Sequence, residues 1–425
     1  MKRLFLLLFL FVSVFCNAQE VAAAANIRTA QLYRRGDQTS FPITALGVTE
    51  ALQLEFDDLD DDIKNYYYSF QLCNADWSPS ILRPFEYLRG FQTVRINTYR
   101  NSSLSYTRYT HYQANLPDRN CVPIRSGNYL LRVFLNGDTS KIVFTKRMVI
   151  VDDRTKVGAV IQQPYSGQLF RTSQKLQIVI NTDERVQNLN PTDLRVVVLQ
   201  NYNWRTALFL DRPTIYRGNY YEYSDEAQMT MPAGKEFRWI DLRSFRLLSD
   251  RMERMNNTKD STVVYIKPDP SRESHTYLYY RDYNGRYTIE TLDSINPFWQ
   301  ADYGWVHFTF VPPGNKGYEG KDVYIFGELT NYAQDPEAKM EYNADKGVYE
   351  KTLFLKQGYY NYEYVTLPQK ESQNAYPDVS STEGNYWGTE NAYTVLVYYR
   401  PFGSRADELV GYTTLNSAFD QRGGF

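Results

Sequence analysis

Apolar and polar residues alternate along short stretches of this chain, which is the pattern of half-buried β-strands. The alternation is clearest at residues 51–56 and 129–134, and it is looser at 176–180. Asn-Gly pairs at 136–137 and 284–285 accept the positive φ angles of hairpin turns. Helical periodicity is scarce, with residues 242–255 as the best candidate. The pattern therefore predicts an all-β protein of tandem β-sandwiches.

Two breaks divide the strand-rich sequence. Polar residues 152–154 follow an apolar stretch, and prolines and glycines are concentrated at 311–317. Proline cannot donate to a β-ladder, so the second break favours a linker. A length of 425 residues suggests three domains at roughly 150 residues each. The expected units are 26–153, 154–311 and 318–400, followed by a polar tail at 401–425.

The N-terminus has the features of a cleavable secretory signal over residues 1–18. Two basic residues precede an apolar run at 4–15, and small residues follow up to Ala18. The run is shorter than the roughly 20 apolar residues that cross a bilayer. We expect cleavage after Ala18 and export to the periplasm. Attachment of a lipid to Cys16 is the alternative, although the preceding Phe15 is larger than the residue that usually stands there.

Charge and composition narrow the class of partner. Basic and acidic side chains number 47 and 49, for a net charge of -2, so the chain lacks the basic surface that nucleic-acid binding requires. The 38 tyrosines suit half-buried sheet faces, where the ring packs and the hydroxyl group reaches water. A minority of them can form a contact surface for another protein. We expect neither nucleic acid nor a small-molecule substrate.

Residues that could carry chemistry form no known catalytic or metal-binding pattern. The histidines His111, His275 and His307 lie far apart, without the spacing of a metal site. The chain has no G-x-S-x-G elbow, P-loop or dinucleotide fingerprint. The acidic run at 57–62 lacks the glycine and glutamate of a calcium-binding loop. These absences favour a protein that is not an enzyme and that needs no cofactor or metal.

Cys73 and Cys121 remain after removal of the signal. In an oxidising compartment they could form a disulfide bridge, which would stabilise the fold by about 4 kcal/mol for a loop of this length. Two buried thiols that pack as small apolar side chains are the alternative.

The C-terminal unit contains strand-like stretches at 323–327, 347–350 and 358–364, separated by turns. It resembles the early-set immunoglobulin-like modules that are related to glycogen-binding domains. Asn331-Tyr332 occupies the turn where many sugar-binding relatives carry a tryptophan. The resemblance supports tandem immunoglobulin-like or early-set β-sandwiches. It also keeps one alternative function open, namely a periplasmic or surface glycan-binding protein.

Five short motifs follow one another between residues 50 and 150. Their residues, for which a structural role is expected, are Asp57, Asp58, Asp76, Trp77, Glu86, Tyr87, Gly90, Phe91, Tyr109, His111, Tyr112, Gly127 and Tyr129. In order and spacing this region resembles the N-terminal domain of the plug protein of the Bacteroidota type IX secretion system. Leu72 departs from the pattern, because relatives often carry a histidine beside the cysteine.

The resemblance implies a protein that is not an enzyme and that acts mechanically. A plug of this family would bind the periplasmic opening of the giant outer-membrane translocon barrel and preserve the permeability barrier. Its partner would be that large β-barrel, and its location the inner face of the outer membrane. A hydrolase without a local motif is a third possibility, and it would need a reactive serine.

Overall fold

The computed structural model of the protein describes residues 21–183, 186, 190–370 and 375–420. The expected signal at 1–18, including Cys16, lies outside the described residues. None of the helices in the described part of the chain has the length and apolar character needed to span a membrane.

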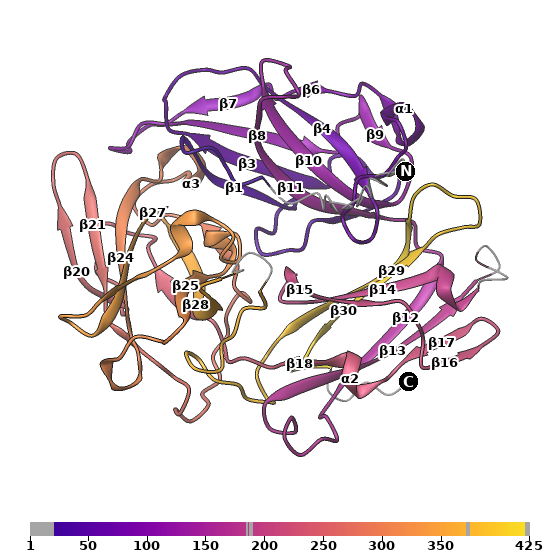
Figure 1. Ribbon diagram of the computed structural model, residues 1–425. Coiled ribbons are helices and arrows are strands. Elements are labelled where there is room, and N and C mark those ends of the chain that lie inside the picture. Colours follow the sequence, from indigo (N-terminus) through magenta and orange to yellow (C-terminus); the bar gives the residue numbers. More distant parts are fainter. Residues whose placement is uncertain (1–20, 184–185, 187–189, 371–374, 421–425) are drawn as a thin grey trace, which may run out of the picture.

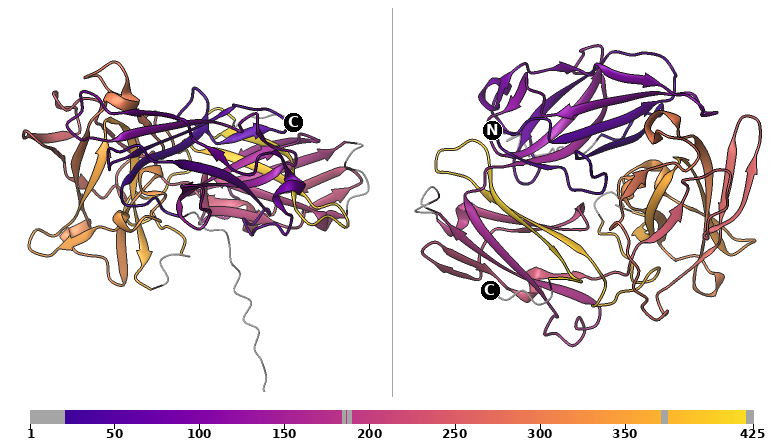
Figure 2. Two further views of the ribbon diagram at one scale, coloured as in Figure 1. Left: turned by 90° about the horizontal axis from the view of Figure 1, so that it is seen from above. Right: turned by 180° about the vertical axis from the view of Figure 1, so that it is seen from behind.

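Strands dominate the molecule and form three lobes around a common centre, as Figure 1 and the right-hand view of Figure 2 show. The α-helices of the described residues are single turns: α1 (Pro84–Tyr87), α2 (Glu226–Met229) and α3 (Pro297–Gln300). Short 3-10 turns are η2 (Pro191–Asp193), η3 (Pro313–Asn315), η4 (Glu328–Thr330) and η5 (Pro336–Ala338). The predicted all-β class of tandem sandwiches is confirmed.

The first lobe is a sandwich of two sheets. One sheet has the order β1 (Ile27–Arg34), β3 (Leu52–Asp58), β8 (Thr110–Leu116) and β7 (Thr98–Asn101). The other has the order β2 (Ile43–Ala45), β11 (Ile142–Val151), β10 (Gly127–Leu135), β4 (Tyr66–Cys73) and β6 (Val94–Arg95). A small pair, β5 (Leu88–Gly90) and β9 (Cys121–Pro123), lies beside them. Side chains of both sheets, such as Phe56 and Leu131, share one buried core.

The second lobe is completed by the C-terminal strands. Its first sheet contains β12 (Thr155–Gln162), β13 (Ser173–Thr182), β17 (Tyr220–Tyr223), β16 (Ile215–Arg217) and β18 (Thr230–Pro232). Its second sheet has the order β15 (Asn203–Leu210), β14 (Leu194–Gln200), β29 (Ala392–Tyr399) and β30 (Glu408–Asn416). Ile178 and Val395 meet in its core.

The third lobe is formed by the part of the chain between β18 and β29, that is, between the two segments of the second lobe. One sheet contains β19 (Arg238–Asp241), β28 (Gly358–Pro368), β23 (Tyr287–Ile289) and β25 (Lys321–Phe326). The other contains β20 (Met252–Asn257), β21 (Thr262–Ile266), β24 (Tyr303–Val311), β27 (Val348–Lys356), β26 (Glu341–Asn343) and β22 (Asp269–Pro270). Tyrosines of β28 and the apolar residues of β24 form its core.

The pairing of the strands crosses the domain boundaries that the sequence suggested at residues 311 and 318. β24 ends at Val311 and pairs with β27, so the proline-rich stretch after it is a loop inside the third sandwich. The expected polar tail contains β30, whose Leu409 and Val410 are fully buried. The physical reason is that local composition marks where a strand ends, whereas the strand it pairs with is set by packing of distant segments.

The structure contains the hairpin turn predicted at 136–137, but it does not contain the helix expected at 242–255. Asn136 and Gly137 have φ angles of 54° and 73°, and they join β10 to β11 in the predicted turn. The region 242–255 is not helical; it contains a turn and the start of β20. Its apolar residues Leu242, Phe245 and Met252 are buried in the core of the third sandwich, which overrides a weak helical pattern.

The first and second sandwiches are stacked through a shared apolar layer. Leu130 and Val149 of the first sandwich are buried against Val197 and Leu396 of the second. These strands therefore carry buried side chains on both faces, which explains their nearly continuous apolar sequence. The two lobes are held together by a core of their own.

Candidate functional site

The contacts between the three sandwiches contain many of the motif residues. Asp57 and His111 face the third sandwich, and Trp77 faces the second. We therefore treat these contacts as the candidate functional site.

A buried polar network joins the first sandwich to the third. Asp57 of β3 accepts hydrogen bonds from the hydroxyl group of Tyr303 at 2.6 Å and from that of Thr29 at 3.0 Å. Its carboxylate oxygens also lie 2.7 Å from Nδ1 of His111 and 2.5 Å from Nζ of Lys356. Asp57 is completely buried, so its charge has no access to water and depends on these partners.

The charges of this network compensate one another. Burial alone would raise the pKa of Asp57, but Lys356 and His111 outweigh it and hold this pKa at about 2. The Lys356 ammonium group also donates to the carbonyl group of Phe298 at 2.7 Å and lies 4.2 Å from the ring centroid of Tyr109. Burial lowers the pKa of Lys356 despite its ion pair. The buried pair fixes the first and third lobes against each other.

The first and second sandwiches meet through the motif that surrounds Trp77. The ring of Trp77 packs edge-on against that of Trp204 with centroids 4.8 Å apart, and the guanidinium group of Arg147 lies 4.7 Å above Trp77. Asp76 stabilises the turn that presents this ring, because its carboxylate accepts a hydrogen bond from the backbone N–H of Ser78 at 2.9 Å.

Polar contacts surround this aromatic pair. The Asp407 carboxylate accepts a hydrogen bond from the backbone N–H of Ala75 at 2.9 Å, and Arg400 donates to Asn74 at 2.8 Å. Gly127 has φ of +141° beside the backbone of Asp407, where a Cβ atom would lie 3.1 Å from the carbonyl oxygen. Glycine is therefore required at this close approach.

The second and third sandwiches are joined around Tyr332. Arg205 donates to the carbonyl groups of Tyr332 and Ala333, at 3.3 and 3.2 Å. The hydroxyl group of Tyr332 donates to the carbonyl group of Asn201 at 3.2 Å. The turn at 331–332 is thus half-buried against the second sandwich, which leaves little of the tyrosine ring for stacking on a sugar.

The remaining motif residues belong to the interior or the edge of the first sandwich. Tyr87, Tyr112 and Tyr129 are core residues. The buried Tyr109 belongs instead to the contact with the third sandwich, because its hydroxyl group donates to the carbonyl group of Ala301. Gly90 lies so close to Asn120 that a Cβ atom would be 2.1 Å from its carbonyl oxygen.

Two further motif residues lie at the surface. Glu86 forms an ion pair with Arg405, in the loop between β29 and β30 that Figure 1 shows beside α1. Phe91 is 67% exposed and is the one aromatic motif residue that faces solvent.

The acidic run forms an ion cluster around a lysine. The carboxylates of Asp58, Asp60 and Asp62 lie within 4.8 Å of one another, the only such group of three possible metal ligands in the described part of the chain. Nζ of Lys64 lies 2.8 Å from Asp58 and 3.3 Å from Asp62, and also contacts Asp60. The ammonium group of Lys64 therefore occupies the position that a metal ion would take among these carboxylates.

Cys73 and Cys121 are free and buried, so the disulfide bridge considered from the sequence is not formed. Cys73 packs in the layer shared with the second sandwich, whereas Cys121 packs in the core of the first. Burial raises the pKa of each thiol to about 12, which disfavours the reactive thiolate form. Both cysteines act as small apolar side chains.

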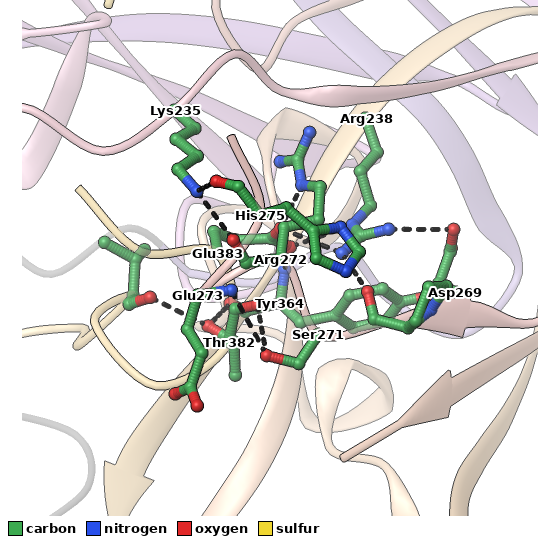
Figure 3. Close-up of polar contacts among 12 residues, drawn as sticks. Lys235, Arg238, Asp269, Ser271, Arg272, Glu273, His275, Tyr364, Thr382 and Glu383 are labelled. Atoms are coloured by element: carbon green, nitrogen blue, oxygen red, sulfur yellow. Dashed lines mark hydrogen bonds and ion pairs between the residues drawn. The ribbon is translucent and has the colours of Figure 1, made fainter. Parts of the chain in front are cut away.

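A second buried ion network lies within the third sandwich, and no sequence motif marks it (Figure 3). Arg238 donates to Glu383 at 2.9 Å and to Asp269 at 3.0 Å, and Arg272 donates to Glu383 at 2.6 Å. Burial would raise the pKa of Glu383, but the two arginines hold it at about 2. The network fixes the segment after β28 against the sheet. Its residues come from distant segments, so their spacing carries no signal.

The fold and these contacts define an all-β protein, in which motif residues join three sandwiches into one body. The model of the Type 9 secretion system plug protein 1st domain matches residues 27–152, which is the first sandwich. A hypothetical protein from Parabacteroides merdae, known from a crystal structure, is similar over 93% of this chain and 98% of its own. Its sequence is 31% identical, and the TM-score is 0.87. No curated protein matches the chain.

This chain belongs to the type IX secretion system plug protein family. Its role therefore lies in type IX secretion. The family is a structural component of secretion and not a known family of enzymes.

Proposed function

We propose that the protein binds the periplasmic opening of the large outer-membrane translocon barrel of type IX secretion and closes it when no substrate is present. The membership of the plug family supports this function. Large β-barrels enclose water-filled lumens, so a barrel of this kind would leak without a closing element.

The observation that carries the proposal is the fixed arrangement of the three lobes. A plug must cover a wide opening without deforming under its partner. The shared apolar layer around Leu396 holds the first two sandwiches together, and the buried pair of Asp57 and Lys356 holds the third. Such internal contacts favour one broad rigid body over three domains that move on linkers.

Surface charge is also compatible with reversible binding. The net charge of -2 is small for a chain of 425 residues, so overall charge would neither repel nor hold a partner strongly. The expected signal at 1–18 supports a periplasmic location at the inner face of the outer membrane, where the plug would meet the barrel.

Gene deletion tests this function. Cells without the protein should become sensitive to a large glycopeptide antibiotic that intact outer membranes exclude. Restoring the gene should reverse the sensitivity, and removing the barrel as well should abolish it. Unchanged sensitivity in the single deletion, with the barrel present and open, would contradict the proposal.

A further inference from the structure

A cavity of about 400 Å³ lies between the second and third sandwiches. Its walls come from the β14–β15 turn, the segment that links the two sandwiches, β28, the residues Phe326 and Tyr332, and residues 376–380. Residues that face it include Asn203, Phe237, Glu363, Tyr376 and Asn385. Its volume falls within the range of small-molecule sites, roughly 300–1,000 Å³.

Glu363 is an unusual residue for its position. Side chains alternate along β28, and Tyr362 and Tyr364 point to the core, where both hydroxyl groups donate to Asp269. Glu363 therefore faces the other side of the sheet, the side of Val365 and Leu367, which belong to a separate apolar cluster. It is only 6% exposed. A carboxyl group on an apolar wall costs free energy unless something binds it.

The neighbouring cations are engaged elsewhere. Arg238 and Arg272 both donate to Glu383 (Figure 3). The ammonium group of Lys235 donates to the carbonyl groups of Arg272 and His275, at 2.6 and 2.9 Å. Among the described residues, no side chain forms a hydrogen bond or ion pair with the carboxyl group of Glu363.

The surroundings of Glu363 disfavour the charged form of its carboxyl group. Burial, together with the nearby Glu383, raises the pKa of Glu363 well above its ordinary value, against the opposing effect of Arg272. The neutral, protonated form of the carboxyl group is therefore favoured over the charged form. A positive charge that enters the cavity would favour ionisation of this group, because it compensates for the desolvation of the carboxylate.

We propose that this cavity binds a small organic cation with a primary ammonium group, and that Glu363 is its counter-ion. Phe237, Phe326 and Tyr376 line the same cavity, and aromatic rings attract cations. The bound ammonium group would donate to the Glu363 carboxylate, and the proton that the carboxyl group loses would pass to solvent. The proposal rests on the cavity alone and does not depend on the proposed function.

Isothermal titration calorimetry with benzylamine and benzyl alcohol tests the proposal, since the two probes have nearly the same shape and differ in charge. At pH 7 the wild-type protein should bind benzylamine at least about tenfold more tightly, as a charge-assisted hydrogen bond predicts. Titrations in two buffers of different ionisation enthalpy should show that protons are released when benzylamine binds and not when benzyl alcohol binds.

The variant Glu363→Gln keeps the shape of the side chain and removes its charge. It should lose both the preference for benzylamine and the release of a proton. Glu319→Gln, at an exposed position, is the matched control and should keep both. Equal binding of the two probes by the wild-type protein, or no binding of benzylamine at millimolar concentration, overturns the proposal. A preference that persists in Glu363→Gln overturns it as well. The proton count on the wild-type protein decides the question even if the variant does not fold.

Discussion

The carboxylate of Asp57 lies 2.5 Å from the ammonium group of Lys356, although 299 positions separate the two residues in the chain. Asp57 belongs to the first sandwich and Lys356 to the third, and both side chains are buried. A charge pair without access to water fixes the two lobes in one relative position. This pair links a motif of the first sandwich directly to the third.

Removing one member of the pair should destabilise the protein strongly. Lys356→Met leaves the Asp57 carboxylate buried without its cation, and we expect a loss of about 3–5 kcal/mol in the free energy of unfolding. Urea denaturation followed by fluorescence measures this loss. The exposed Lys316→Met is the control and should change stability by less than about 0.5 kcal/mol. The double variant Asp57→Asn, Lys356→Met should recover most of the loss; a double variant as unstable as Lys356→Met would refute the pairing.

The shared apolar layer predicts a second effect. Leu396→Ala removes a fully buried side chain between the first and second sandwiches and should cost about 2–5 kcal/mol. Because this substitution weakens the contact between the two lobes, a protease should cut the variant near residues 152–154 sooner than it cuts the wild-type protein. Val395→Ala, on the opposite face of the same strand, should lower stability without this early cut. An identical proteolysis pattern for the two variants would count against a distinct inter-lobe layer.

The state of the cysteines can be read by mass spectrometry. Both thiols are buried, so the native protein should resist alkylation. After unfolding without a reductant, Cys73 and Cys121 should each take one alkyl group. Protein that takes none until a reductant is added would show that the two are bridged.

Acid should lower the free energy of unfolding, because the folded state stabilises the ionised carboxylates of Asp57 and Glu383. The pKa values of Asp57 and Glu383 are both about 2 in the folded state, below their ordinary values of 3.8 and 4.5. The unfolded chain therefore takes up protons first as the pH falls. The stability that these groups provide is complete above about pH 5 and is lost progressively towards pH 2.

For Asp57 alone the shift corresponds to about 2 kcal/mol. Urea midpoints measured between pH 6 and pH 3 should fall, and they should fall less steeply in the double variant Asp57→Asn, Lys356→Met. Equal slopes in the two proteins would show that Asp57 does not contribute.

Local patterns in the sequence predict the strands and the Asn136-Gly137 hairpin because these depend on neighbouring residues. They do not predict that β29 pairs with β14, where Val397 lies opposite Val196, because this pairing joins distant segments. The sequence does carry one indication that β14 and β29 are central strands. Residues 196–199 and 395–397 are continuous apolar runs, which are typical of strands buried on both faces.

The candidate site was predictable in part for the same reason. Asp57, Trp77 and His111 stand out because they lie in motifs that resemble a family. Their partners Tyr303, Lys356 and Trp204 come from other segments, and nothing in the local sequence around them marks them. Glu383 and Glu363 become recognisable only when burial is known, since an isolated glutamate in a strand is usually a surface residue.

The most direct test of the proposed function is affinity purification of the tagged protein from gently solubilised native membranes, followed by mass spectrometry. If the protein is a plug, one very large outer-membrane β-barrel should be recovered with it in near-equal amount. Recovery of the protein alone, or with glycan in place of a barrel, would contradict a plug and would favour a free periplasmic binding protein.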